Sequence, residues 1–244
     1  MEAVAYNALK TLQDRHWWFE GRRQFITSLI GHTFPGKTDL AILEAGCGYG
    51  GNLSMLGEFG TVEGFEFNAA ARQHAAVISG HAVAYGHLPD NPGFDNRQFD
   101  LVAMLDVLEH IDDDAGSLKA LRNLIARNGR ILITVPALPW LWSKHDEIHH
   151  HKRRYDKGSL KRVLIEAGFN PVNIGYFNSL LFPLALGQRV AQNVFGLENS
   201  VDDLPPQPLN SILTKVFGLE RKVVGRFGMP IGLSLFAIAE PRRD

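Results

Sequence analysis

Residues 42–52 read Ile-Leu-Glu-Ala-Gly-Cys-Gly-Tyr-Gly-Gly-Asn, and this stretch decides the fold class. A short apolar run ends at the acid Glu44, and glycines follow at positions 46, 48, 50 and 51. Glycines at this density allow positive φ and let a ligand approach the backbone closely. A helical pattern begins directly after them. The stretch therefore predicts a strand, a tight turn and the N-terminus of a helix.

The glycine spacing fits two classes of ligand. Gly46, Gly48 and Gly51 satisfy the dinucleotide fingerprint G-x-G-x-x-G. A dinucleotide would place its pyrophosphate on this turn, where the carboxylate of Glu44 would repel it. A ligand with an ammonium and a sulfonium would instead be favoured by that carboxylate. Glu44 thus disfavours an NAD-dependent oxidoreductase, which stays the alternative enzyme.

Length and composition favour one α/β domain. The chain has 244 residues, of which 45% are hydrophobic, enough for one sizeable core. The formal net charge of -1 gives no reason to expect a nucleic-acid partner. Cys47 is the only cysteine, so no internal disulfide can form. Since no signal peptide and no membrane-spanning stretch is apparent, we expect a cytoplasmic protein.

Strand and helix patterns alternate along the chain, which predicts a doubly wound, Rossmann-like sheet with helices on both faces. We expect an N-terminal helical cap (1–33), a cofactor-binding core (34–177), a helical insertion (178–228) and a final strand (229–244), all in one domain. The expected strands are 41–44, 61–65, 81–85, 101–105, 130–135, 172–177 and 233–239. The expected helices are 52–59, 69–78, 115–126, 157–167, 180–195 and 209–226.

Residues after the second expected strand suit a nucleoside. Glu66 lies twenty residues after Gly46, where an acid can accept hydrogen bonds from both ribose hydroxyls. Phe67 follows it and is placed to cover one face of an adenine. Arg23, which follows the aromatic residues 16–19, is a candidate to hold a ligand carboxylate.

Taken together, these motifs resemble class I methyltransferases that use S-adenosylmethionine. The resemblance runs from about 41 to 169 and includes Glu-x-Gly-x-Gly-x-Gly from Glu44, Gly-Phe-Glu ending at Glu66, and Asp-Val-Leu-Glu-His at 106–110. It implies a seven-stranded sheet that is mostly parallel, with the last strand antiparallel, and a helical insertion between strands six and seven. It also implies a cofactor site lined by Gly46, Gly48, Glu66, His87, Leu88 and Leu105.

The sequence departs from many relatives at Gly86-His87, where they carry an acid that bonds the adenine amine. Within the family, His-Trp-Trp-Phe at 16–19 and the loop from Trp142 to Tyr155 resemble a subgroup of bacterial and archaeal enzymes.

Asp106, Glu109 and His110 are candidates for acceptor chemistry. On a helical turn, positions i, i+3 and i+4 share one face. Two carboxylates and an imidazole suit a divalent metal ion, and any of the three could act as a base on an acceptor hydroxyl. The pattern is similar to Glu-x-x-Glu-His in ubiquinone-pathway and small-RNA 2′-O-methyltransferases, with Asp106 in place of the first Glu. Alternatively, Glu109 and His110 only organise the helix start, and Asp106 contacts the cofactor.

The loop of residues 139–155 is a second candidate for acceptor chemistry, because it is long and rich in reactive side chains. His145 and His151 could each supply a base, and Asp146 could orient one of them. Trp140 and Trp142 are candidates for the wall of an acceptor pocket. The alternative is a solvated loop.

The sequence thus predicts an S-adenosylmethionine-dependent methyltransferase that methylates oxygen in a small-molecule or lipid-linked acceptor, with a divalent metal as an option. A non-catalytic S-adenosylmethionine-binding regulatory module is the alternative that involves no chemistry. Residues 178–228 would cover the acceptor site, form a homodimer surface, or touch a membrane through the apolar residues 180–195.

Overall fold

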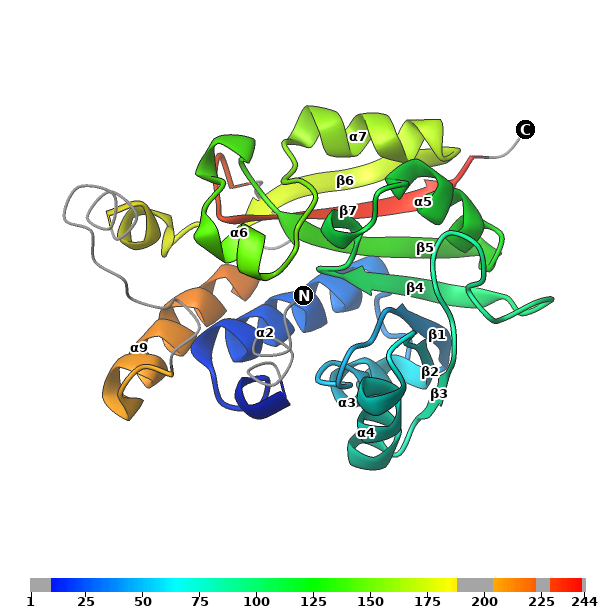
Figure 1. Ribbon diagram of the computed structural model, residues 1–244, viewed down its shortest axis with the longest axis horizontal. Coiled ribbons are helices and arrows are strands. Elements are labelled where there is room, and N and C mark those ends of the chain that lie inside the picture. The colour runs from blue at the N-terminus through cyan, green and yellow to red at the C-terminus, as the bar shows by residue number, and fades with distance from the viewer. Residues whose placement is uncertain (1–9, 188–203, 223–228, 243–244) are drawn as a thin grey trace.

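A seven-stranded sheet runs through the computed structural model, which describes residues 10–187, 204–222 and 229–242. The strand order is β3-β2-β1-β4-β5-β7-β6, and β7 is antiparallel to both of its neighbours while the other pairs are parallel (Figure 1). This confirms the predicted fold class. The strands are β1 Leu40–Ala45, β2 Gly60–Phe65, β3 Ala82–Ala84, β4 Phe99–Leu105, β5 Ile125–Pro136, β6 Phe169–Phe177 and β7 Ser234–Pro241.

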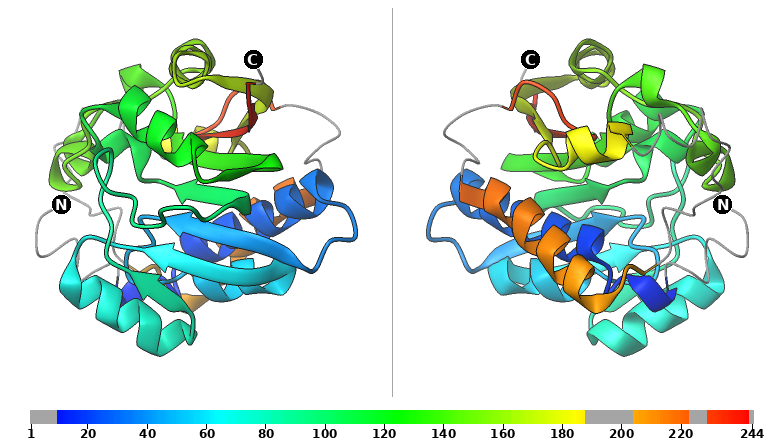
Figure 2. Two further views of the ribbon diagram at one scale, coloured as in Figure 1. Left: turned by 90° about the vertical axis from the view of Figure 1, so that its right-hand side faces the viewer. Right: turned by 90° about the vertical axis from the view of Figure 1, so that its left-hand side faces the viewer.

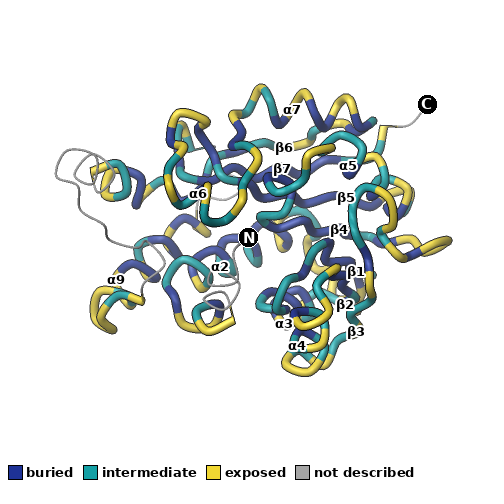
Figure 3. Tube along the Cα trace, viewed as in Figure 1, coloured by how far each residue is buried: buried dark blue, intermediate teal, exposed yellow. Residues whose placement is uncertain are grey.

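Helices cover both faces of the sheet (Figure 2). One face carries α2 (Trp17–Thr33), α3 (Leu53–Leu56), α4 (Ala69–Ser79) and α9 (Gln207–Gly218), and the other carries α5 (Asp114–Arg122) and α7 (Lys157–Glu166). Short helices are α6 (Lys144–Ile148) and the 3-10 turns η1 (Gly57–Phe59), η2 (Leu108–His110), η3 (Pro139–Leu141) and η4 (Leu219–Lys222). The sheet itself is the most deeply buried layer (Figure 3).

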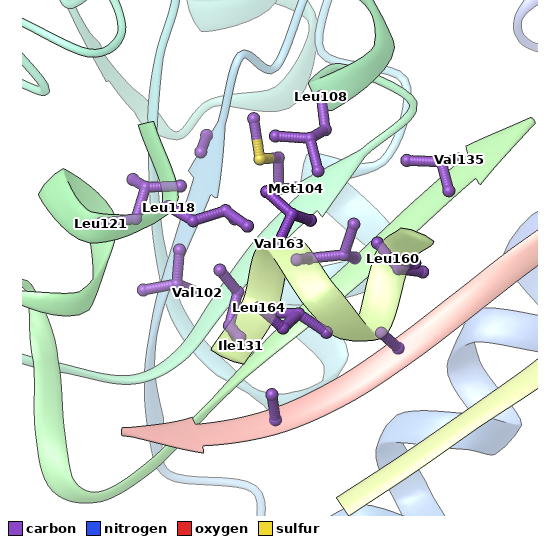
Figure 4. Packing of buried hydrophobic residues seen from close by; sticks show 14 of the residues in the cluster. Val102, Met104, Leu108, Leu118, Leu121, Ile131, Val135, Leu160, Val163 and Leu164 are labelled. Atoms are coloured by element: carbon purple, nitrogen blue, oxygen red, sulfur yellow. The ribbon is translucent and has the colours of Figure 1, made fainter. Parts of the chain in front are cut away.

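The central strand β4 explains why there are two cores. Its side chains alternate between the faces, and Val102 and Met104 pack with α5 and α7 in one cluster (Figure 4). Leu101, Ala103 and Leu105 belong to the cluster under α2 and α3. A strand buried on both faces needs an uninterrupted apolar sequence, which is the pattern found at 101–105.

Several element boundaries differ from the sequence predictions. The helix expected over 115–126 ends at Arg122, because Ile125 already pairs with Phe99 and begins β5. The helix expected over 52–59 is one α-helical turn, α3, that continues as η1. In the insertion, residues 182–187 are helical and α9 with η4 ends at Lys222. The remaining parts of the two predicted helices, 188–195 and 223–226, lie outside the described residues.

Helix α9 of the insertion lies beside α2, which comes almost two hundred residues earlier. The Trp17 N–H donates to Asn210 Oδ1 at 2.9 Å, and Ser28 Oγ donates to the Arg221 carbonyl at 2.9 Å. The Phe217 ring occupies the space that a side chain at Gly21 would need. The residues in contact follow the same order along both segments, so α2 and α9 run parallel. Within the described ranges, no helix is long and apolar enough to cross a membrane.

Candidate cofactor and acceptor site

The glycine-rich turn after β1 has the conformation that its sequence predicts. Gly46, Gly48 and Gly50 have φ of 73°, 54° and 85°, the left-handed region that favours glycine. A Cβ on Gly50 would lie 2.9 Å from the Ala75 backbone, so α4 closes against the turn. The N–H groups of Gly46 and Cys47 both donate to the Phe65 carbonyl at 3.0 Å. These bonds fix the turn to the end of β2.

Glu66 is held at the mouth of this turn. Its carboxylate is buried and accepts the Gly48 N–H at 3.0 Å and the Asn68 N–H at 2.9 Å. Phe67 follows it with 62% of its side-chain surface exposed. A rigid acid beside an exposed ring is the arrangement expected for a ribose next to an adenine.

A chain of buried polar side chains runs from this turn to the end of β4. Asn52 Nδ2 donates to Glu44 Oε1 at 2.7 Å, Arg22 Nη2 donates to Asn52 Oδ1 at 3.2 Å, and Arg22 forms an ion pair with Asp106. Burial raises the pKa of the Glu44 carboxyl to about 7, against opposing effects of Asn52 and Arg22. Burial also lowers the pKa of the Arg22 guanidinium, to about 10.

The sequence singles out Arg23 of the two neighbouring arginines, but Arg22 is the one that lies in this buried chain. Its guanidinium carbon lies 4.6 Å from the centroid of the Trp18 ring, one helical turn earlier on α2. The predicted carboxylate-binding residue, Arg23, instead donates to the carbonyls of Gln13 at 2.7 Å and Gly51 at 3.4 Å. The i, i+4 spacing of Trp18 and Arg22 was the available signal, because it places a stacked cation on one helix face.

The expected helical turn from Asp106 to His110 is wrong. Asp106 has φ of 55°, and a 3-10 turn covers only Leu108–His110. The Asp106 N–H donates to the Thr134 carbonyl at 3.0 Å. This bond continues the pairing of β4 with β5 by one residue beyond the end of β4. Asp106 therefore lies with Arg22, and does not share a helical face with Glu109 and His110.

Glu109 and His110 gather instead with His151 from the loop after β5. One ligand atom of each lies within 4.8 Å of the other two. The loop is held there by the Lys152 N–H, which donates to the Glu109 carbonyl at 2.7 Å. Among the described residues, Glu109 Oε2 has no hydrogen-bond partner. Burial raises the pKa of Glu109 to about 8, and burial and His151 lower the pKa of His110 to about 3.

Asp146 organises the loop from inside it. Its fully buried carboxylate accepts hydrogen bonds from His151 Nδ1 at 2.9 Å, Arg154 Nε at 2.7 Å and the Ser143 N–H at 2.9 Å. Burial by itself would raise the pKa of Asp146, but these bonds dominate and hold it well below its usual range. Asp146 thus fixes the ring of His151, as the sequence suggested for one of the loop histidines.

The positions of the other residues predicted for the cofactor and acceptor sites are as follows. The ring of His145 is 6.1 Å from that of His151 and 4.2 Å from that of His149, centroid to centroid. Leu105 is buried at the end of β4. His87 Nδ1 lies 3.3 Å from the Tyr85 hydroxyl, and Leu88 is partly buried. Trp140 and Trp142 are 62% and 42% exposed. The cofactor and acceptor roles of these residues stay predictions.

Comparisons with known proteins agree with this geometry. The family model for a methyltransferase domain matches residues 18–174. Ubiquinone biosynthesis O-methyltransferase of Serratia proteamaculans is 33% identical over 148 residues, which are 51% of this chain and 57% of that protein. An uncharacterised protein of Methanocaldococcus jannaschii is 28% identical, over 44% of this chain and 46% of its own. The chain thus spans about half the length of the curated relatives it matches.

Solved structures show the same fold. A TehB-like S-adenosylmethionine-dependent methyltransferase from Corynebacterium glutamicum has a TM-score of 0.54 at 18% identity, covering 91% of this chain and 87% of its own. An S-adenosylmethionine-dependent methyltransferase from Clostridium acetobutylicum has a TM-score of 0.59 at 11% identity, covering 90% and 92%. At these identities the likeness concerns the fold alone.

Proposed function

The chain belongs to the methyltransferase domain family, and we propose that it transfers a methyl group from S-adenosylmethionine to an oxygen of a small-molecule or lipid-linked acceptor. The observation that carries the proposal is the position of Glu109, His110 and His151, which converge at the sheet edge where the glycine-rich turn also lies. Ligands of open α/β sheets bind at this edge.

The cofactor would occupy the glycine-rich turn between β1 and α3. Gly46 and Gly48 let it approach the backbone, and Glu66 accepts hydrogen bonds from its ribose hydroxyls. Phe67, with His87 and Leu88, covers the adenine, while Leu105 lies by the methionine chain. Glu44 favours the ammonium group, and Arg22 takes the carboxylate in place of, or together with, Arg23.

Methyl transfer is an in-line displacement, so the site must hold an acceptor lone pair behind the methyl group. A hydroxyl acceptor must also lose its proton. Burial lowers the pKa of both His110 and His151, which favours the neutral rings that can accept a proton. Because the pKa of His110 falls to about 3, His110 is the weaker base, and His151, whose pKa the Asp146 hydrogen bond raises against burial, is the better candidate. Asp146 holds His151 in position. Two further residues are candidates for the base. His145 lies in the same loop as His151, and Asp106 is paired with Arg22.

A divalent metal ion fits the same group of residues. Glu109 offers a buried carboxylate oxygen with no hydrogen-bond partner among the described residues, and His110 and His151 offer neutral imidazoles. Such an ion would lower the pKa of an acceptor hydroxyl. His151 would be the third metal ligand in place of Asp106, which the sequence pattern suggested, because Asp106 is paired with Arg22. Glu109 must lose its proton to bind a cation.

The insertion supplies two further candidates for contact. Leu180 and Leu184 are 45% and 59% exposed, which supports the proposed membrane or lipid contact of residues 180–195 as far as residue 187. Its part beyond 187 lies outside the described residues. A homodimer through 178–228 is the other option.

Calorimetric titration with S-adenosylhomocysteine and, separately, with NAD tests the cofactor. We expect micromolar binding of S-adenosylhomocysteine, weakened at least tenfold by Glu66→Ala and unchanged by Glu63→Ala on the same β2 strand. NAD binding without S-adenosylhomocysteine binding would establish the oxidoreductase instead.

Titration with Mn²⁺ in the same buffer tests the metal. Binding that is lost in His151→Ala and kept in His32→Ala, at the end of α2, is the expected result. A protein that binds S-adenosylhomocysteine but no metal, and whose His151→Ala variant methylates every acceptor as well as wild type, would favour a base-free mechanism or the regulatory module.

A further inference from the structure

Helix α9 carries apolar side chains on two faces. Leu213 and Phe217 are buried beneath it, in the cluster that includes α2. On its outward side Leu209 and Ile212 are 47% and 57% exposed, and Leu219, the first residue of η4, is 49% exposed. Val216 lies at the margin of this side, half-buried and partly packed against the same cluster. Spacings of three and four residues place all of these outward side chains on one side of the helix. We call this set, Leu209, Ile212, Val216 and Leu219, the outer stripe.

Within residues 207–222, the exposed charged side chains are all positive. Lys215, Arg221 and Lys222 are exposed and form no ion pair with any described residue. The one acid of this segment, Glu220, is 1% exposed and faces inward, where it accepts the N–H groups of Ser179 and Leu180 at 2.7 and 2.8 Å. The outward face of residues 207–222 is therefore both apolar and cationic.

This face begins at the functional edge of the sheet. The first turn of α9 is bonded to Trp17, at the N-terminal end of α2, and the chain leaves the opposite end of α2 to enter β1. The start of α9 thus lies at the edge where the parallel strands end. Residues 178–187 leave β6 at that edge too, and Phe182 contacts Trp140 at 6.5 Å between ring centroids. Figure 2 shows α9 and residues 182–187 on the same outer side of the molecule.

Two occupants fit an exposed apolar stripe, and the charges decide between them. A second copy would pair the stripe with itself and bring the same cations together with no exposed acid from residues 207–222 to meet them. The adjacent helix α2 would add a single acid, Glu20, against these three cations. An anionic lipid surface meets both requirements at once, because apolar side chains enter the acyl boundary while Lys and Arg reach the headgroups.

We propose that the outer stripe of α9, with Lys215, Arg221 and Lys222, binds the surface of a membrane that contains anionic phospholipids. The helix would lie in the plane of the interface, with the exposed Leu180, Leu184 and Trp140 close to the same surface. If the proposed methyl transfer is correct, this orientation turns the acceptor site toward lipid-linked substrates.

Co-sedimentation of the full chain with vesicles tests the proposal. We expect binding to phosphatidylcholine vesicles with 30% phosphatidylglycerol, roughly a hundredfold weaker binding to pure phosphatidylcholine, and weakening by 1 M NaCl. Leu209→Gln with Ile212→Gln should weaken binding about tenfold or more. Lys215→Glu with Arg221→Glu should weaken it by at least about twentyfold, since each cation contributes about fivefold.

Two matched variants and two parallel measurements keep the result decisive. Val77→Gln and Ile165→Gln remove exposed apolar side chains from α4 and α7 and should leave vesicle binding unchanged. Circular dichroism and S-adenosylhomocysteine titration on every variant separate this surface from folding and from the proposed function. Absent vesicle binding in a folded, cofactor-binding protein would overturn the proposal. So would a wild-type dimer, seen by sedimentation velocity, that becomes a monomer when Leu209 and Ile212 are replaced.

Discussion

In the cofactor half of the site, hydrogen bonds join residues that are close in the chain, with Gly48 and Glu66 separated by 18 positions and Glu44 and Asn52 by 8. Arg22 links this half to the residue after β4, because it pairs with Asp106 across 84 positions. In the acceptor half, the loop after β5 folds back on Glu109, where the Lys152 N–H donates to the Glu109 carbonyl. The first half is built mainly from backbone groups and glycines, the second from buried charges. Local backbone geometry can be recognised in a sequence, whereas long-range charge pairing appears only once the chain has folded.

The largest expected effect is a loss of stability when the charge that organises the acceptor half is removed. Asp146→Ala leaves Arg154 buried without its carboxylate partner, so the free energy of unfolding should fall by about 3–5 kcal/mol. Urea denaturation followed by circular dichroism measures this loss. Glu147→Ala, an exposed neighbour on α6, should change it by less than about 0.5 kcal/mol. Similar small losses in both variants would mean that the loop is not held by buried charge.

The second prediction concerns pH, and it follows from Glu44. The pKa of its carboxyl is about 7 in the folded protein and 4.5 in the unfolded chain, so between these values the folded state holds a proton that the unfolded state releases. Stability is therefore greatest below pH 4.5 as far as Glu44 is concerned, and falls as pH rises toward 7, by at most about 3 kcal/mol. Glu44→Gln should reduce the slope in urea denaturation between pH 5 and 7, and leave the part due to Glu109, whose pKa burial raises to about 8. Parallel curves for both proteins would contradict it.

Bound cofactor should lower the pKa of Glu44, which burial raises in the free protein. An ammonium group near the carboxylate favours its ionised form, so binding of S-adenosylhomocysteine at pH 6 should release a proton. Calorimetry in two buffers with different ionisation enthalpies counts that proton. Glu44→Gln is the matched control and should release less.

The fourth prediction concerns a smaller effect and compares two neighbouring arginines on α2. Arg22→Gln removes a buried cation from beside Asp106 and Asn52, and should weaken S-adenosylhomocysteine binding by about 2 kcal/mol, or roughly thirtyfold. Arg23→Gln, which removes hydrogen bonds to the Gln13 and Gly51 carbonyls, should weaken it less than about threefold. The reverse ranking would restore the carboxylate role that the sequence assigns to Arg23.

These contrasts explain what could be predicted. The alternation of strands and helices and the glycine turn follow from periodicity and from positions that favour glycine, whereas the antiparallel last strand is expected from the family resemblance. The helix boundary at Arg122 could not be predicted, because the pairing of Ile125 with Phe99 overrides a local helical pattern. His151 and Glu109 are 42 positions apart, and only the return of the loop brings them together. Asp106 was misplaced for a related reason, since its bond to β5 interrupts the expected turn.

The smallest expected effect concerns Phe67, at the exposed limit of the cofactor half. Because 62% of its surface is exposed, Phe67→Ala should leave the unfolding free energy within about 0.5 kcal/mol of wild type. If the ring covers the adenine, S-adenosylhomocysteine binding should weaken by about 1 kcal/mol, or fivefold, and Phe67→Tyr should restore it. Titration of adenosine alone should show the same loss, because the stacking energy belongs to the base. An unchanged affinity would mean that the cofactor half ends at Glu66, and that its strength lies entirely in the buried acid and the glycine backbone.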